Sequence, residues 1–122
     1  MRGANKYGAI PTVVDNIQFD SKMESQYYQH LKLMERAGLI TELSLHPKFI
    51  LLEPFKKFGK RRTGIKYTAD FMYKDEHGKS IVVDVKGAIA RDFSLRRALF
   101  DSKFPDITLR VVTKKGRGWE EK

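Results

Sequence analysis

Two stretches, Tyr67-Thr68-Ala69-Asp70-Phe71 and Ile81-Val82-Val83-Asp84-Val85-Lys86-Gly87, decide the fold of this 122-residue chain. They lie within two β-rich runs, 65–73 and 80–85, which enclose the turn sequence Asp75-Glu76-His77-Gly78. A three-residue turn over 76–78 with glycine in its last position is a favoured hairpin connection. Pairing centred on His77 then places Asp70 directly opposite Asp84, and a bulge would shift that register by one residue.

The predicted aspartate pair is unfavourable by itself, because carboxylates that face each other at about 5 Å between Cβ atoms repel. A divalent cation between Asp70 and Asp84 removes the repulsion, and Mg²⁺ takes carboxylate oxygens together with water and phosphate. Lys86 shares a strand face with Asp84, where it can orient or deprotonate a water or stabilise charge on a phosphate. Gly87 leaves room for a nucleic-acid backbone. The alternative is that these are solvated strand residues with no shared role.

A third acid, Glu24, has two competing interpretations. Ser21-Lys22-Met23-Glu24 has the spacing of a helix capping box. The apolar stripe that follows at helical spacing predicts a helix over 21–37 that ends at Gly38; its members are Met23, Tyr27, Leu31 and Met34. The Glu24 carboxylate either caps this helix or points from its first turn toward the hairpin. Both roles use the same oxygens.

The remaining pattern predicts an α/β protein with a mixed central sheet flanked by helices. We expect short strands at 17–19, 39–45 and 49–52, a helix at 93–104 that stops before Pro105, and a strand at 107–112. Residues 1–16 are expected to form a flexible basic arm, residues 17–112 one domain, and residues 113–122 a polar tail.

The composition restricts the possible functions. The chain has 24 lysines and arginines against 15 acids, for a formal net charge of +9, which favours nucleic-acid binding. The absence of cysteine excludes disulfides, thiolate zinc sites and cysteine nucleophiles. No apolar run approaches the roughly 18–20 residues of a membrane span, and the start of the sequence has no signal-peptide core. We therefore expect a cytoplasmic protein with neither a membrane partner nor an organic cofactor.

Candidate DNA-binding residues fall in two groups. Residues 56–66 hold six bases, two glycines and no acid, together with Phe58, which indicates a loop or hairpin tip that follows a phosphate backbone or is merely solvated. The candidates there are Lys57, Lys60, Arg61, Arg62 and Lys66. Near the second helix they are Arg91, Arg96 and Arg97, and the last two point about 100° apart, so one of them faces the site. No pattern suggests a helix that reads bases in a groove, which favours recognition of shape or backbone.

The sequence resembles the PD-(D/E)xK nuclease superfamily, through Asp70 followed by Asp84-Val85-Lys86 and with Glu24 on the preceding helix. More narrowly, it is similar to small phage-encoded endonuclease-like proteins related to archaeal Holliday-junction resolvases. The stretches that carry this likeness follow in order along most of the chain: Asn5-Lys6-Tyr7-Gly8, Phe19-Asp20-Ser21-Lys22-Met23-Glu24, Pro47-Lys48-Phe49, Ala69-Asp70-Phe71 and Asp84-Val85-Lys86-Gly87.

The resemblance implies a restriction-endonuclease-like αβββαβ core and hydrolysis of DNA phosphodiesters with Mg²⁺, or with Mn²⁺ in its place. It implies that Asp70 and Asp84 are metal ligands, that Lys86 is the catalytic lysine and that Glu24 is an auxiliary acid. Branched recombination intermediates such as Holliday junctions are the implied substrates, and two symmetric cuts across a junction require a homodimer. The sequence departs from the family pattern in two ways: the second acid is Asp where many members have Glu, and Thr68-Ala69 stand where the first motif has proline.

Two non-catalytic readings remain open. A basic nucleic-acid-binding module, such as a double-stranded-RNA-binding domain, has a similar size and order of elements and requires no acids on its sheet. A basic structural or assembly protein would show only charge-driven binding that fades uniformly with salt.

Overall fold

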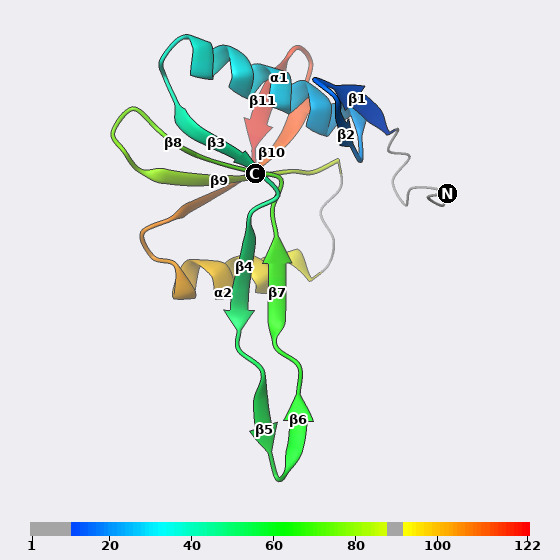
Figure 1. Cartoon of the computed structure of the whole chain (residues 1–122), viewed down its shortest axis with the longest axis vertical. Helices are drawn as coiled ribbons and strands as arrows, with labels where there is room; N and C mark the ends of the chain where they lie inside the picture. Colours follow the sequence, from blue (N-terminus) through cyan, green and yellow to red (C-terminus); the bar gives the residue numbers. More distant parts are fainter. Residues whose placement is uncertain (1–10, 88–91) are drawn as a thin grey trace.

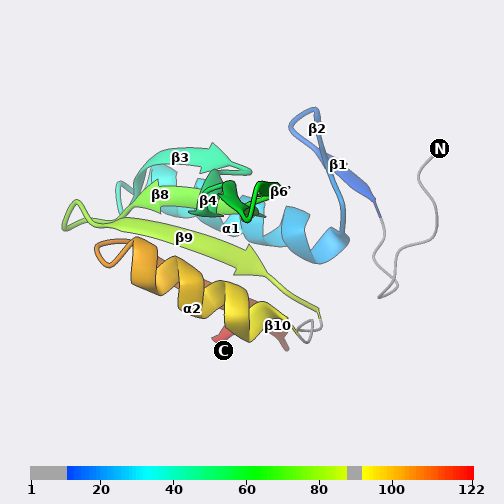
Figure 2. The same ribbon diagram turned by 90° about the horizontal axis from the view of Figure 1, so that it is seen from below.

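The computed structural model describes residues 11–87 and 92–122 and contains a five-stranded mixed sheet with one helix on each face (Figures 1 and 2). The helices are α1 (Lys22–Arg36) and α2 (Phe93–Lys103). The sheet order is β11-β10-β9-β8-β3, with bounds Gly118–Glu121, Thr108–Lys115, Ser80–Val85, Phe71–Lys74 and Thr41–Leu45. Strands β9 and β10 are parallel, and the other pairs are antiparallel. The predicted α/β class with a mixed central sheet is confirmed.

Side-chain alternation along β8 and β9 divides the core into two layers. Phe71 and Val83 pack with Tyr28 and Leu31 of α1. On the opposite face, Val82 packs with residues of α2 such as Phe100. Both faces of the hairpin are therefore covered, which is why residues 81–84 are all buried.

The β8–β9 hairpin has the predicted register. Its pairs run from Lys74↔Ser80 to Phe71↔Val83 and are centred on His77. The Asp75 carboxylate accepts the backbone N–H groups of His77 and Lys79, each at 2.9 Å, which closes the turn. Gly78 has a φ of +76°, a left-handed conformation that favours glycine. The turn chemistry thus fixes the register that brings Asp70 and Asp84 to the same end of the hairpin.

Helix α1 begins as its capping signal predicts. The Ser21 hydroxyl accepts the backbone N–H of Glu24 at 3.0 Å, and Gly38 follows the helix with a φ of +77°. Tyr27 and Leu31 are buried in the α1-side core. The second helix, expected over 93–104, spans Phe93–Lys103. Neither helix in the described ranges is long and apolar enough to cross a bilayer.

Residues 48–68 form a long two-stranded projection, here called the finger, which leaves the sheet between β3 and β8 (Figure 1). Its strands are β4 (Lys48–Leu52), β5 (Phe55–Lys57), β6 (Lys60–Arg62) and β7 (Ile65–Thr68). The pairs β4–β7 and β5–β6 follow one another outward. Phe49 anchors the inner half, because its ring lies 5.0 Å from that of Phe100 on α2. All residues of β5 and β6 are exposed.

The two chain ends differ from expectation. The strand expected at 107–112 continues to Lys115, and β11 pairs back onto it, so the proposed polar tail at 113–122 is an edge hairpin of the sheet. Trp119 explains this difference, because its ring packs edge-on against Tyr27 at 4.8 Å. Within the proposed arm 1–16, β1 (Thr12–Val14) pairs with β2 (Ile17–Phe19), while residues 1–10 lie outside the described residues.

Candidate active site

The candidate site lies where the finger joins the sheet. At this point β3 leads into the first strand of the finger and its last strand leads into β8. The chain changes pairing partner between Ala69 and Asp70: the Ala69 N–H bonds to the Pro47 carbonyl at 3.0 Å, and the Asp70 N–H bonds to the Val83 carbonyl at 3.1 Å. The regular β8–β9 ladder therefore ends at Phe71↔Val83, one step short of the predicted Asp70–Asp84 pair. This junction turns Asp70 toward the end of β9.

Asp84 is the more buried of the two aspartates, with only 3% of its surface exposed. It points to the α2 side of the sheet, where the Tyr67 hydroxyl donates a hydrogen bond to its Oδ2. Burial and the nearby Asp84 raise the pKa of Tyr67 above its ordinary value, so this hydroxyl remains a donor. Burying a charged carboxylate in a central strand costs desolvation free energy unless strong partners compensate it. A buried acid at this position therefore suggests a function.

Asp70 lies close enough to Asp84 to be affected by its charge. Its Oδ2 accepts the backbone N–H of Val85 at 2.7 Å. Burial raises the pKa of Asp70 to about 9, and the carboxylates of Asp84 and Glu24 push it in the same direction. A carboxyl group with so high a pKa is neutral at pH 7 unless a cation beside it favours the ionised form. The structure thus brings together Asp70 and Asp84, as the sequence predicted. The two residues are not direct cross-strand partners, because the chain changes its pairing partner between Ala69 and Asp70.

Glu24 approaches the same site from α1. It is 6% exposed, and its Oε1 lies 3.3 Å from Nε2 of His46. Burial raises the pKa of Glu24, the hydrogen bond with His46 opposes that shift, and Asp84 adds to it. Because Ser21 caps the helix through the backbone N–H of Glu24, the cap and a role in the site are compatible: the carboxylate itself contacts His46.

Lys86 lies beside Asp84, as strand alternation predicts. Its Nζ is 3.4 Å from Asp84 Oδ2 and 5.1 Å from the centroid of the Phe93 ring. Its side chain remains 30% exposed, so the ammonium group can reach a ligand from solvent. The next residue, Gly87, is exposed, and a Cβ there would meet only the end of Met23 at an ordinary 3.9 Å. The chain itself therefore does not require a glycine at this position.

Two contributors were missed by the sequence analysis, His46 and Tyr67. His46 adopts a left-handed φ of +54°, and its backbone N–H bonds to the Asp70 carbonyl at 2.9 Å. A non-glycine residue in this conformation is strained, and such strain is common at functional sites. Neither residue carries a local signal, because each one acts on an acid that is 17 or 22 residues distant in the sequence.

The donor set fits a magnesium ion. Within residues 11–87 and 92–122, no group of three or more histidine, aspartate or glutamate side chains is arranged to hold a metal. Asp70 and Asp84 nevertheless lie close enough for the charge of Asp84 to raise the pKa of Asp70. Mg²⁺ is usually bound by one or two carboxylates while water and substrate phosphate fill its remaining positions, so two aspartates are a sufficient set of protein ligands for this ion.

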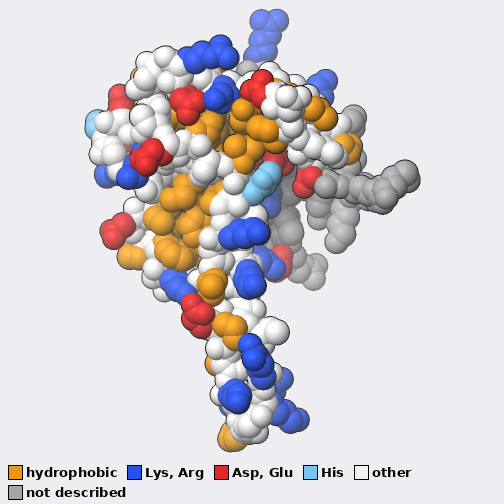
Figure 3. All heavy atoms as spheres, in the orientation of Figure 1, with side chains coloured by type: hydrophobic (Ala, Val, Ile, Leu, Met, Phe, Trp, Pro, Cys, Tyr) orange, Lys and Arg blue, Asp and Glu red, His pale blue; other side chains and the backbone are white. Residues whose placement is uncertain are grey.

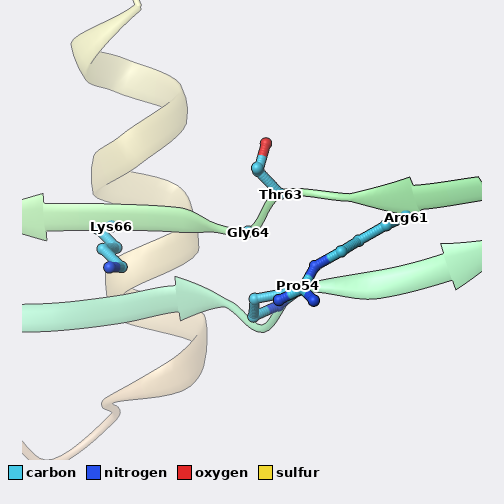
Figure 4. A pocket seen from close by; sticks show the side chains of 5 residues that line it. All are labelled: Pro54, Arg61, Thr63, Gly64 and Lys66. Atoms are coloured by element: carbon cyan, nitrogen blue, oxygen red, sulfur yellow. The ribbon is translucent and has the colours of Figure 1, made fainter.

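The basic candidates divide between the finger and α2. Lys57, Lys60, Arg61 and Arg62 lie on the outer half of the finger, and Lys66 lies on β7. Arg61 and Lys66 line an open pocket with Pro54, Thr63 and Gly64, and the Arg61 side chain runs back toward Pro54 (Figure 4). A Cβ on Gly64 would lie 2.0 Å from the Leu52 carbonyl oxygen, so only glycine allows this close approach of the strands.

Only one of the two adjacent arginines on α2 faces the finger. Arg96 donates to the Lys66 carbonyl at 3.1 Å. Arg97 instead donates to the carbonyls of Leu109 and Lys122, which ties α2 to the C-terminal strands, and its DNA contact stays a prediction. Arg91, the third predicted contact near α2, lies outside the described residues.

These features define an α/β protein with coupled acids at the root of a basic finger. Residues 4–118 match the model of the DUF1064 family, described as a protein family of unknown function, and the chain belongs to that family. No curated protein and no solved structure matches the chain.

Proposed function

We propose that this protein is a Mg²⁺-dependent DNA endonuclease with a restriction-endonuclease-like core, and that it hydrolyses phosphodiesters of branched DNA such as Holliday junctions. The observation that carries the proposal is the neighbouring pair Asp70 and Asp84 at the end of β9, with the Lys86 ammonium 3.4 Å from Asp84. A carboxylate whose pKa is strongly raised by burial and by a neighbouring acid, as that of Asp70 is, beside a partly exposed lysine, is typical of a catalytic site.

Asp70 and Asp84 are the residues that would hold the metal. Bound there, Mg²⁺ supplies a Lewis acid that polarises a phosphate oxygen and lowers the pKa of a coordinated water. The protein fixes the geometry of this pair by two hydrogen bonds, one from Val85 to Asp70 and one from Tyr67 to Asp84. Such partners limit the rotation of ligating carboxylates and tune their basicity.

Lys86 and Glu24 complete the site from opposite sides. The Phe93 ring and Asp84 hold the Lys86 ammonium, where it hydrogen-bonds the attacking water or stabilises charge on the phosphate in the transition state. Glu24, held by His46, would provide an auxiliary carboxylate that orients groups around the metal pair. We assign catalysis to Lys86 and the metal pair, and positioning to Glu24.

The substrate is assigned from charge and shape. The finger presents Lys57, Lys60, Arg61 and Arg62 without any acid between residues 56 and 66, which suits a phosphate backbone. Two symmetric cuts across a four-way junction need two active sites, so we assign a homodimer. A phage-encoded protein of this kind would act in the bacterial host cytoplasm.

The test combines cleavage with binding. Supercoiled DNA and a synthetic four-way junction are incubated with the wild type in Mg²⁺, in Mn²⁺ and in chelator. We expect cleavage only with metal, and a loss of at least about 100-fold in Asp84→Asn and Lys86→Ala with binding in chelator preserved. Asp101→Asn is the matched control, because Asp101 is an exposed acid on α2 and the substitution makes the same change of charge.

Each outcome decides between the functions considered. Binding without cutting on every DNA tested, in both metals, would contradict the nuclease and leave a nucleic-acid-binding module. Equal cleavage by Asp84→Asn and Asp101→Asn would show that the activity does not come from this site.

A further inference from the structure

The tip of the finger carries an aromatic side chain that folding does not use. Phe58 and Gly59 form the two-residue connection between β5 and β6, with φ angles of +51° and +74°. Positive φ at both positions defines a turn that favours Asn-Gly, and a bulky residue there is strained. Phe58 is nevertheless present and is 93% exposed. The backbone strain at Phe58 has no compensating burial within the chain, which points to a role in contacting a ligand.

The surroundings of this ring point to a nucleic acid as the ligand. Lysine and arginine side chains gather along the finger (Figure 3), with seven of them between residues 48 and 68 against the single acid Glu53. Lys57 pairs directly with Lys60 across the ribbon, an arrangement of like charges that destabilises an isolated hairpin. The Lys57 ammonium lies 5.6 Å from the centroid of the Phe58 ring. An exposed ring flanked by cations suits a base face with phosphates beside it.

We propose that Phe58 stacks on an open base-pair face at a DNA branch point, while the cations of the finger follow the backbone of the adjoining duplex. This inference rests on the proposed function, because it specifies the DNA that the Asp70–Asp84 site would cut. Inserting a side chain into a continuous duplex requires unstacking a base step, which costs about as much as one ring gains by stacking. At a branch the stack is already interrupted, so the ring gains contact without that cost.

The finger also sets a distance between the branch and the cut. From Phe58 to Asp70 there are twelve residues along β6 and β7, which span about 40 Å when fully extended. One turn of duplex DNA is about 34–36 Å long. Both roots of the finger lie at the site, since His46 precedes β4 and Asp70 follows β7. The cut therefore falls within about one helical turn of the branch.

The test measures binding in chelator, where no cleavage occurs. The full-length protein is titrated against a labelled four-way junction, an uninterrupted duplex of equal length and a single strand. Phe58→Asn removes the ring and supplies the residue that the turn prefers, so a loss of binding cannot come from misfolding of the turn. We expect about tenfold weaker junction binding, little change on the duplex, and recovery in Phe58→Trp. Leu33→Ala, an exposed apolar residue on α1, is the control.

The salt dependence separates stacking from charge. Phe58→Asn should leave the slope of log K against log salt unchanged, because it removes no phosphate contact. Lys60→Ala should weaken binding to both junction and duplex and lower that slope by about 1.

The outcomes distinguish this inference from the proposed function. If Phe58→Asn binds the junction as the wild type does, or weakens single-strand binding equally, branch stacking is wrong whether or not the wild type cuts DNA. If junction binding depends on Phe58 but the wild type cuts no DNA in Mg²⁺, the nuclease is wrong and the stacking surface stands. Where cutting occurs, cleavage more than about one turn from the branch contradicts the reach of the finger.

Discussion

The β8–β9 hairpin and the outer half of the finger are both two-stranded antiparallel ribbons, yet their side chains are distributed in opposite ways. In β8–β9, Phe71 and Val83 contact the α1 side of the core, and Val82 contacts the α2 side. In β5 and β6 every residue is exposed, and most are cationic. Burial stabilises the first ribbon and fixes its geometry to the precision that paired acids require. The second ribbon adds little to stability, so its side chains can be cationic and free to contact a charged ligand.

The largest expected effect contrasts the two ribbons directly. Phe71→Ala removes a fully buried ring and should lower the free energy of unfolding by about 3–5 kcal/mol. Phe55→Ala, on β5 with 45% of its surface exposed, should lower it by less than about 1 kcal/mol. Urea denaturation followed by circular dichroism measures both. Similar losses from the two substitutions would mean that the finger is part of the cooperative core.

The next prediction concerns the acids at the root of the finger. Because the pKa of Asp70 is raised to about 9 in the folded protein, the unfolded chain loses this proton first as the pH rises. The metal-free protein should therefore lose stability between about pH 4 and pH 9. Asp70→Asn should flatten that decline and raise the stability at pH 8 by at least about 1 kcal/mol. Melting temperatures across this range in chelator provide the measurement.

Magnesium should oppose the loss of stability that the wild type shows as the pH rises. A cation shared by Asp70 and Asp84 favours their ionised forms, so added Mg²⁺ should raise the melting temperature most at high pH and should have no such effect on Asp70→Asn. A wild type that is indifferent to Mg²⁺ at pH 8 would argue against a metal at this pair.

The features that the sequence predicted well have local physical causes. The hairpin register follows from the turn that Asp75 and Gly78 close, and the start of α1 follows from the Ser21 cap. Lys86 shares a face with Asp84 because side chains alternate along a strand. These signals act over a few residues and need no knowledge of the rest of the fold.

The features that the sequence did not predict depend on distant contacts. Tyr67 and His46 each bond to an acid from another element, and nothing in their own neighbourhood marks them. The C-terminal hairpin was predicted to be a polar tail because most of its residues are charged. Its apolar contact, of Trp119 with Tyr27 on α1, has no periodic signal in the sequence. The outer finger has no apolar period, since it packs against nothing, so its strands were read as a loop or hairpin tip.

A smaller effect is expected midway along the finger. Gly64→Ala places a Cβ 2.0 Å from the Leu52 carbonyl oxygen, so the strands must separate there. DNA binding in chelator should fall several-fold because the cations beyond this point lose their alignment, while the free energy of unfolding changes by less than about 1 kcal/mol. Thr63→Ala, at the neighbouring exposed position, serves as the control. A large loss of stability from Gly64→Ala would show instead that the finger supports the sheet.

The smallest effect tests the strain at the tip. Phe58→Asn replaces a left-handed phenylalanine with a residue that tolerates this conformation, and should stabilise the turn by up to about 1 kcal/mol. If the finger opens independently of the core, the free energy of global unfolding should hardly change. Amide exchange of β5 and β6 should then slow by up to about fivefold. Exchange followed by NMR measures both regions in one sample. Slowing of the β8–β9 amides as well would show that the two ribbons unfold as one unit, which would remove the contrast between a rigid site and an independently moving finger.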